Sequence, residues 1–408
     1  MSIKLVSREV FMPSPQKGTA VHATTYYTRR DTLDLVCMHG YETRSDTCDV
    51  SFIRFSTDNG RTWGEPTEHT PTFDDPRGTG RNYINGGDVD PYTGRYLTIR
   101  NYGILPTDDP LEGMRQWHLN YTVSEDGGHT NTVHEQIICE GDEFNATHPM
   151  PEVEIGRNCV MMGDNGQRPL FMPNGDILVP TQSSIVDENG DLSNPGGGYT
   201  YTDCVLLIGR WTDDGHITWR ASQRVKVDPA LSSRGMIEPT LAVLEDGTVI
   251  MVMRGSNDNR NEIPGRRWIS RSTDGGGTWT DPEPWTWDDG EAFYSPSAMS
   301  QLLRHSDGRL FWLGNISSEN ANGNSPRYPL VMGEVDNDTG LLIRDTTVAI
   351  DDRGQEDSPH MTLSNFYARE DRETGEIVLQ MSRLFQRDFR IEGKIDWTAD
   401  SYIYRISI

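Results

Sequence analysis

Short runs in which apolar and polar residues alternate recur along the whole chain. Examples are DVSFIRFS (residues 49–56) and RRWISRS (residues 266–272), where every second residue is apolar or aromatic. A period of two is typical of half-buried β-strands. No segment shows the longer period of an extended amphipathic helix, so the pattern predicts an all-β protein.

Pairs of such runs flank tight turns. In LAVLEDGTVIMVMR (residues 241–254) and LFMPNGDILVPTQ (residues 170–182), apolar residues surround an Asp-Gly or Asn-Gly pair, which is a strong hairpin signal. Six hairpins of this kind, each followed by a further pair of strands, predict a six-bladed β-propeller that spans residues 1–408 as a single domain. Segment 3–12 is expected to close the last blade. The blades are expected near residues 20–66, 80–135, 158–222, 236–288, 294–350 and 360–408.

One eight-residue motif is repeated between predicted strands. It reads STDNGRTW at residues 56–63 and STDGGGTW at 272–279, with weaker copies at 124–130 and 211–219. The Asp is expected to accept hydrogen bonds from turn amides, the Gly to adopt a positive φ, and the Trp to pack over the turn. The motif is therefore predicted to stabilise the blades and to take no part in chemistry.

Charge and cysteine content narrow the functional classes. A formal charge of -25 at pH 7 makes nucleic acids and anionic membranes poor partners. The five cysteines are widely spaced and include no CxxC pair, so neither a disulfide framework nor a zinc site is predicted. The start of the chain lacks the pattern of a secretion signal, and no apolar run reaches the roughly 18 residues of a membrane helix. We expect a cytoplasmic protein with no metal or cofactor, and its oligomeric state stays open.

Repeats of the form S-x-D-x-G-x-T-W on a six-bladed all-β chain resemble the sialidase (neuraminidase) superfamily, also called the BNR or Asp-box repeat family. The resemblance covers nearly the whole chain. It implies an exo-acting glycoside hydrolase on a carbohydrate with a terminal acidic sugar, either sialic acid or a related ulosonic or uronic acid. In that family three arginines bind the sugar carboxylate, a glutamate activates a tyrosine nucleophile, and an aspartate is the acid/base.

Three residues match this constellation. In EPTLAVLEDGTVIMVMR, Glu238 corresponds to the activating glutamate and Arg254 to the second arginine. In SPRYPLVMGEV, Arg327 is the candidate for the third arginine. The alternatives are a structural ion pair for Glu238 and an ordinary loop arginine for Arg327.

Two positions depart from the family. His22 stands where the resemblance places the first arginine, and His39 where it places the acid/base aspartate. Because histidine transfers protons near neutral pH, His39 is a candidate acid or base, with a structural role as the alternative. Arg168, in NGQRPLF, is a candidate replacement for the missing arginine or else a residue of a bulged turn.

The tyrosine is the weakest match. Tyr367 and His360 lie in the last predicted blade, and Tyr294 lies before the fifth hairpin, where it is a candidate substrate contact. Tyr367 is the preferred nucleophile, although a strand tyrosine commonly serves packing alone.

Two other functions stay open on the same scaffold. One is a lyase that eliminates across a uronic acid, with an arginine neutralising the carboxylate. The other is a propeller that binds glycans without catalysis.

Overall fold

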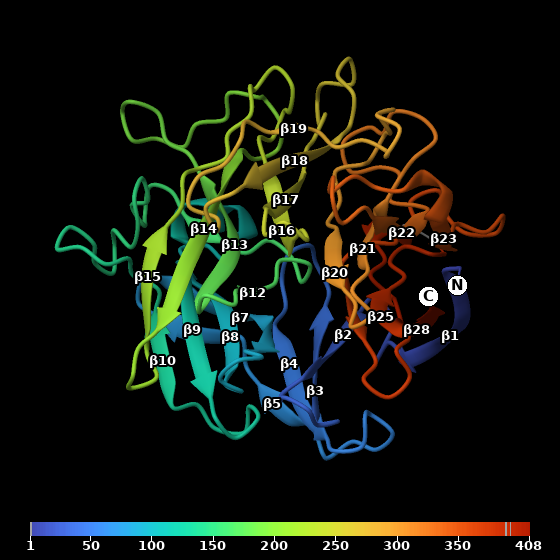
Figure 1. Ribbon diagram of the computed structural model, residues 1–408, viewed down its shortest axis with the longest axis horizontal. Helices are drawn as coiled ribbons and strands as arrows, with labels where there is room; N and C mark the ends of the chain where they lie inside the picture. The colour runs from blue at the N-terminus through green and yellow to red at the C-terminus, as the bar shows by residue number, and fades with distance from the viewer. Residues whose placement is uncertain (1, 388–389, 392) are drawn as a thin grey trace.

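Strand pairing follows chain order around the molecule. The computed structural model describes residues 2–387, 390–391 and 393–408. Within these ranges, six antiparallel sheets of four or five strands form the blades of a six-bladed β-propeller (Figure 1). The all-β prediction and the number of blades are thereby confirmed.

The first three blades follow one another directly. Blade 1 contains β2 (Ala20–Tyr27), β3 (Leu35–Glu42), β4 (Val50–Ser56) and β5 (Thr67–His69). Blade 2 contains β6 (Thr72–Asp75), β7 (Gly78–Val89), β8 (Tyr96–Leu105), β9 (His118–Ser124) and β10 (Val133–Gln136). Blade 3 contains β11 (Val160–Met161), β12 (Leu170–Phe171), β13 (Asp176–Ser184), β14 (Thr202–Trp211) and β15 (Ile217–Ala221).

The second half of the ring ends where the chain began. Blade 4 contains β16 (Ile237–Val243), β17 (Val249–Arg254), β18 (Arg267–Ser272) and β19 (Glu283–Pro284), and blade 5 contains β20 (Gln301–Arg304), β21 (Leu310–Asn315), β22 (Leu330–Val335) and β23 (Val348–Asp351). Blade 6 contains β24 (Phe366–Glu370), β25 (Ile377–Ser382), β28 (Ser401–Ser407) and, from the other end of the chain, β1 (Lys4–Met12). Because β1 pairs with β28, the predicted closure of the last blade by segment 3–12 is confirmed.

Elements outside the blades are short. A small two-stranded sheet joins β26 (Arg390–Ile391) and β27 (Lys394–Ile395). In the described part of the chain, the helices are α1 (Gly113–Gln116) and two 3-10 turns, Pro110–Glu112 and Arg344–Thr346. Of the helices in the described ranges, none has both the length and the apolar character needed to cross a membrane.

The core is divided into layers between neighbouring blades. On β13, Ile177 and Val179 pack with blade 2, whereas Leu178 packs with blade 4. This alternation follows from the period of two in a strand, which sends successive side chains to opposite faces of the sheet. A blade therefore buries both faces, and side chains reach the ends of the propeller mainly where strands begin or end.

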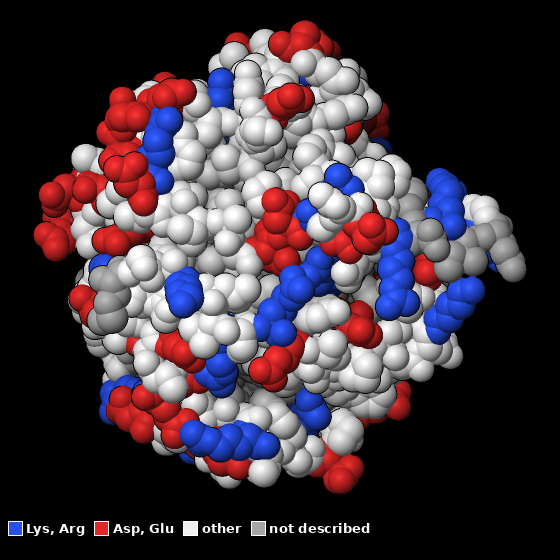
Figure 2. All heavy atoms as spheres, turned by 90° about the vertical axis from the view of Figure 1, so that its right-hand side faces the viewer, with Lys and Arg blue, Asp and Glu red and all other residues white. Residues whose placement is uncertain are grey.

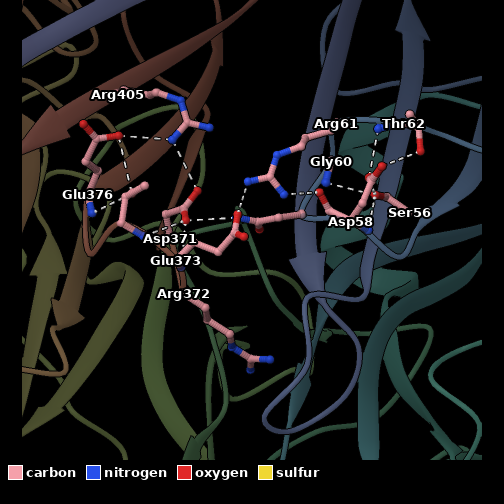
Figure 3. Close-up of polar contacts among 12 residues, drawn as sticks. Ser56, Asp58, Gly60, Arg61, Thr62, Asp371, Arg372, Glu373, Glu376 and Arg405 are labelled. Carbon is pink, nitrogen blue, oxygen red and sulfur yellow. Dashed lines mark hydrogen bonds and ion pairs between the residues drawn. The ribbon is translucent and has the colours of Figure 1, made fainter.

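The repeated motif forms the same turn in three blades. Ser56 Oγ donates to Asp58 at 2.8 Å, and Asp58 accepts from the Thr62 amide at 2.9 Å and the Thr62 hydroxyl at 2.6 Å (Figure 3). Gly60 has φ +82°, as the turn requires. Equivalent bonds form at residues 124–130 and 272–279, while residues 211–219 make an ordinary β14–β15 hairpin.

The copy of the motif in blade 1 also makes contacts with blade 6, where the ring of blades closes. Asn59 donates to Asp371 at 3.0 Å and to Glu373 at 2.9 Å, and Arg61 pairs with Glu373 at 2.5 Å, so the turn contacts the β24–β25 hairpin of blade 6 (Figure 3).

Figure 2 shows acidic and basic side chains interspersed on one face of the molecule. The net negative charge is therefore not gathered into a single patch on that face.

Candidate functional site

Glu238 and Arg254 lie side by side at one end of blade 4. Antiparallel pairing places Ile237, at the start of β16, opposite Arg254, at the end of β17. The pairing slips between Ile237 and Thr240, and Glu238 lies in this irregularity with φ +47°. A left-handed backbone is costly for a residue with a side chain, and more so before a proline such as Pro239. Strain of this kind is often found at functional sites.

The two side chains form a buried ion pair. Arg254 donates to Glu238 Oε1 at 2.6 Å, and the two side chains are 7% and 10% exposed. The remaining nitrogens of Arg254 donate to Ser297 Oγ at 2.8 Å and Asn324 Oδ1 at 3.1 Å. The second carboxylate oxygen of Glu238, Oε2, is buried and has no hydrogen-bond partner in the described part of the protein. It is therefore a free acceptor.

A second carboxyl group, Asp164, lies on a loop that splits the inner strand of blade 3. This loop separates β11 from β12 and approaches Glu238 so closely that a Cβ on Gly163 would lie 2.8 Å from Glu238 Cγ. Gln167 Oε1 accepts hydrogen bonds from the Gly163 and Asp164 amides, and Gln182 Oε1 accepts from the Glu238 amide at 2.7 Å. Two glutamines thus hold the backbones that carry the two carboxyl groups.

The two carboxyl groups have opposite pKa shifts. Burial, and then the negative charge of Glu238, raise the pKa of Asp164 above its ordinary value. Burial alone would raise the pKa of Glu238 as well, but the charge and hydrogen bond of Arg254, with Arg327 and Arg234, lower it. The site therefore pairs a carboxyl group whose pKa is raised to about 7 with a carboxyl group whose pKa is lowered.

Three arginines surround this pair. Burial and the nearby charge of Arg254 lower the pKa of both Arg234 and Arg327 to about 10, which leaves them charged at neutral pH. Arg327 donates to the Ser297 carbonyl at 3.1 Å, and its Nε is buried without a partner in the described ranges. We call Asp164, Glu238, Arg234, Arg254 and Arg327 the carboxyl–arginine cluster. Its surplus of guanidinium groups favours an anionic ligand.

His22 lies at the corresponding end of blade 1. Its Nε2 lies 2.6 Å from Glu42 Oε2, and its Nδ1 lies 3.1 Å from Ser382 Oγ. Burial would lower the pKa of His22, but the hydrogen bond and charge of Glu42, with a further contribution from Asp164, raise it. A protonated His22 would add positive charge on the side where the resemblance places the first arginine.

His39 is not brought together with Glu238. Its ring stacks on Phe52 at 5.1 Å within blade 1, three residues before β3 ends. Burial and the charge of Arg54 lower the pKa of His39 to about 4. The imidazole is therefore neutral near pH 7 and is a weak proton donor or acceptor there.

Tyr367 and Arg168 lie together with Tyr26 in an aromatic cluster. The rings of Tyr26 and Tyr367 are 4.5 Å apart, and the Arg168 guanidinium covers both rings at 4.5 and 4.9 Å. Arg168 also pairs with Asp88 at 2.7 Å. Burial raises the pKa of Tyr367, so its phenol keeps its proton. Arg168 lies in the loop that splits the inner strand, between β11 and β12, which fits the bulged-turn alternative.

Tyr294 has local contacts. Its ring lies 5.0 Å from the Arg266 guanidinium, and its backbone forms an isolated bridge with Ser317. The structure thus brings together Glu238, Arg254 and Arg327, with His22 near Asp164. Within the described ranges, no hydrogen bond or ion pair links His39, Tyr367, Arg168 or Tyr294 to them. The charge of Asp164 does act on Tyr26, which contacts Tyr367 and Arg168.

Asp164, Arg234 and the two positioning glutamines were missed by the sequence reasoning. The one available signal was GDNGQR, a polar stretch that interrupts the inner strand between VMM and PLF. Across the described ranges, no group of three or more His, Cys, Asp or Glu side chains is placed to hold a metal ion.

Similar structures share the fold along the whole chain. A protein of unknown function from Dyadobacter fermentans has a TM-score of 0.62 at 15% identity, covering 100% of this chain and 99% of the other. The NanB sialidase of Streptococcus pneumoniae has a TM-score of 0.58 at 12% identity, covering 98% of this chain and 70% of the sialidase. An α-L-arabinanase of Penicillium chrysogenum has a TM-score of 0.55 at 12% identity, covering 99% of this chain and 98% of the arabinanase. A search among curated proteins found no significant sequence match.

The family assignment rests on the sequence itself. The family described as the BNR repeat-like domain matches residues 110–341, more than half of the 408-residue chain. The match runs from within the second blade to within the fifth and includes Asp164, Glu238 and Arg254. With the six-bladed propeller and its Asp-box turns, this shows that the chain belongs to the BNR repeat-like family.

Proposed function

We propose that this protein is an exo-acting glycoside hydrolase whose substrate ends in an acidic sugar. The proposal is carried by one observation, the buried pair of carboxyl groups with opposite pKa shifts among three arginines. Such a pair separates the two roles that glycoside hydrolysis requires, a proton donor and an anionic carboxylate.

Each residue of the cluster has a role in this proposal. Asp164, whose pKa is raised to about 7, donates a proton from its protonated form to the glycosidic oxygen as the bond breaks. Glu238 is held by Arg254 through one oxygen, and its free Oε2 faces the developing positive charge or activates a water molecule. Arg327 and Arg234 bind the sugar carboxylate. Asp164 therefore replaces His39 as the proposed acid.

The arginines favour an acidic sugar over a neutral one. A neutral glycan would leave Arg234 and Arg327 buried without an anionic partner, which is costly. The structural neighbours include sialidases and an arabinanase, so the fold supports glycan substrates without choosing among them. His22, with its raised pKa, adds to the attraction for a carboxylate.

The test compares leaving groups. Purified protein is assayed on sialic acid and uronic acid glycosides with either a nitrophenyl or an alkyl leaving group. Asp164→Asn should lose about 100-fold or more in kcat on the alkyl glycosides and much less on the nitrophenyl ones, because only a poor leaving group needs protonation. Glu238→Gln should lose activity on both. Glu245→Gln, in the exposed turn of the same hairpin, should change neither.

Three results would contradict the proposal. An unsaturated product that absorbs in the near ultraviolet would indicate elimination instead of hydrolysis. Binding of acidic glycans without turnover would indicate a binding propeller. Equal losses on both leaving groups in Asp164→Asn would show that Asp164 does not act as the acid.

A further inference from the structure

A cavity of about 630 Å³ lies at the junction of blades 2 and 3, apart from the carboxyl–arginine cluster. Its walls come from the segment before β11, the segment after β13 and the segment after β15. None of its lining residues belongs to the cluster. It contains a pair of buried charged groups, Asp203 and Arg224, whose hydrogen-bonding capacity the protein uses only in part.

Asp203 forms part of this cavity because of the strand alternation in β14. Val205 and Leu207, two and four residues further along, pack in the core layer between blades 2 and 3. Asp203 points to the same side, at the end of the strand where the apolar layer gives way to the cavity. Its side chain is 5% exposed, and within the described ranges its carboxylate accepts no hydrogen bond. A buried carboxylate without donors is uncommon in a folded protein.

Arg224 lies opposite Asp203 with one nitrogen unused. Its Nε pairs with Glu152 at 3.1 Å, and its Nη2 donates to Ser183 Oγ at 3.1 Å. Its Nη1 is buried, has no hydrogen-bond partner in the described part of the chain, and lies 3.9 Å from Asp203. The cavity thus offers an unsatisfied acceptor and an unsatisfied donor a few ångströms apart.

The remaining lining suits a neutral ligand with an apolar face. The acidic groups Asp203, Glu152 and Glu154 are balanced by Arg157, Arg224 and Lys226. Tyr201, Val186, Pro195 and Pro229 supply an apolar wall. Adjacent hydroxyl groups of a sugar can donate to a carboxylate and accept from a guanidinium while a C–H face packs on apolar side chains. An acidic sugar would instead face the Asp203 carboxylate.

The cavity continues beyond one sugar ring. A neighbouring cavity of about 460 Å³ shares Glu152, Arg224 and Lys226 with the first. The two cavities therefore flank the Arg224–Glu152 ion pair and give a site with room for more than one sugar unit.

We propose that this cleft is a second carbohydrate-binding site, which holds neutral sugar units through Asp203 and Arg224. It is separate from the proposed catalytic cluster and does not depend on its activity. The site would retain a glycan on the protein while a different part of the same or another chain reaches the cluster.

Calorimetric titration tests the site in a background without turnover. Glu238→Gln protein is titrated with lactose, maltose, cellobiose and arabinobiose. At least one disaccharide should bind saturably, and adding Asp203→Asn should weaken its Kd about tenfold or more, the effect of losing one charged hydrogen bond. Asp213→Asn, an exposed change of the same kind beyond the other end of β14, should leave the Kd unchanged.

A second variant and a folding control accompany this test. Arg224→Gln should weaken the same Kd, and thermal unfolding of each variant shows whether it is folded. The proposal is overturned if no disaccharide binds saturably up to its solubility limit. It is also overturned if binding persists unchanged in folded Asp203→Asn and Arg224→Gln proteins, because the sugar would then occupy another place.

Discussion

The left-handed backbone of Glu238 predicts an unusual order of stability among its variants. Its φ is +47°, and the next residue is Pro239. A residue with a Cβ pays about 1–2 kcal/mol in this conformation, whereas glycine does not. Because the strain arises from the Cβ of residue 238, it can be measured by comparing variants with and without a Cβ at this position.

The comparison is between Glu238→Ala and Glu238→Gly. Both variants remove the carboxylate and leave Arg254 without its partner, which costs about 3–5 kcal/mol in either case. They differ only by the Cβ. In an ordinary strand, a protein with glycine at a given position is less stable than one with alanine there by about 0.5–1 kcal/mol. At this position we expect the reverse, with Glu238→Gly more stable than Glu238→Ala by about 1 kcal/mol.

Urea denaturation followed by tryptophan fluorescence is the suitable assay. For a chain of this length, about 1 kcal/mol shifts the melting temperature by only about 1 °C, whereas the urea midpoint resolves it when both variants have the same slope. If Glu238→Ala is as stable as Glu238→Gly, or more so, the backbone at this position is not strained and the reasoning fails.

Three further outcomes follow from the site. Gly163→Ala places a Cβ 2.8 Å from Glu238 Cγ and should lower kcat at least tenfold while circular dichroism stays unchanged; unaltered turnover would contradict the close approach. His22→Ala should raise KM for an acidic substrate, whereas His39→Ala should leave KM within about twofold, and equal effects would mean that their contacts are misassigned. Burial raises the pKa of Asp203 to about 6, so its ionisation lowers the free energy of unfolding as pH rises from about 4 to 7. The free energy of unfolding of Asp203→Asn, relative to that of the wild type, should therefore be about 3 kcal/mol higher at pH 7.5 than at pH 3.5. A difference that does not depend on pH would refute the shift.

The propeller was predictable because its signals are local. Hairpin turns and Asp boxes depend on residues within about eight positions of each other, and a turn needs the same chemistry wherever it occurs. Each of the six predicted hairpins is an antiparallel strand pair, one in each blade. Closure by β1 was predictable as well, since a ring of blades leaves one strand to be supplied from the other end of the chain.

The ion pair was predictable for a related reason. Glu238 and Arg254 lie at opposite ends of one hairpin, so antiparallel pairing alone places them side by side once the turn is known. Arg327 was assigned from the family resemblance, and the structure places it near Ser297, as it does Arg254. What the sequence could not show is the strain at Glu238, because the slip in strand pairing leaves no mark in the alternation.

His39 shows the limit of reading a strand position from a motif. It lies within β3, and in a propeller both faces of a blade pack against neighbours, so a side chain inside a strand faces another blade. The residues that end a strand, such as Glu42 and Arg254, are the ones that reach the end of the propeller. Three residues separate His39 from that position, which is enough to bury it against Phe52.

Asp164 was missed because its role depends on a contact between blades. A polar loop that splits a strand is indistinguishable in sequence from any surface turn, and only the fold shows that this one approaches Glu238. The contrast between the two carboxyl groups also arises from the fold. Glu238 receives the charge and a hydrogen bond of Arg254, whereas the neighbouring Asn165 amide is the main donor to Asp164. One carboxyl group is thus stabilised as an anion, and burial together with the charge of that anion raises the pKa of the other. Neither residue has this property alone, and so no motif that contains only one of them could have predicted it.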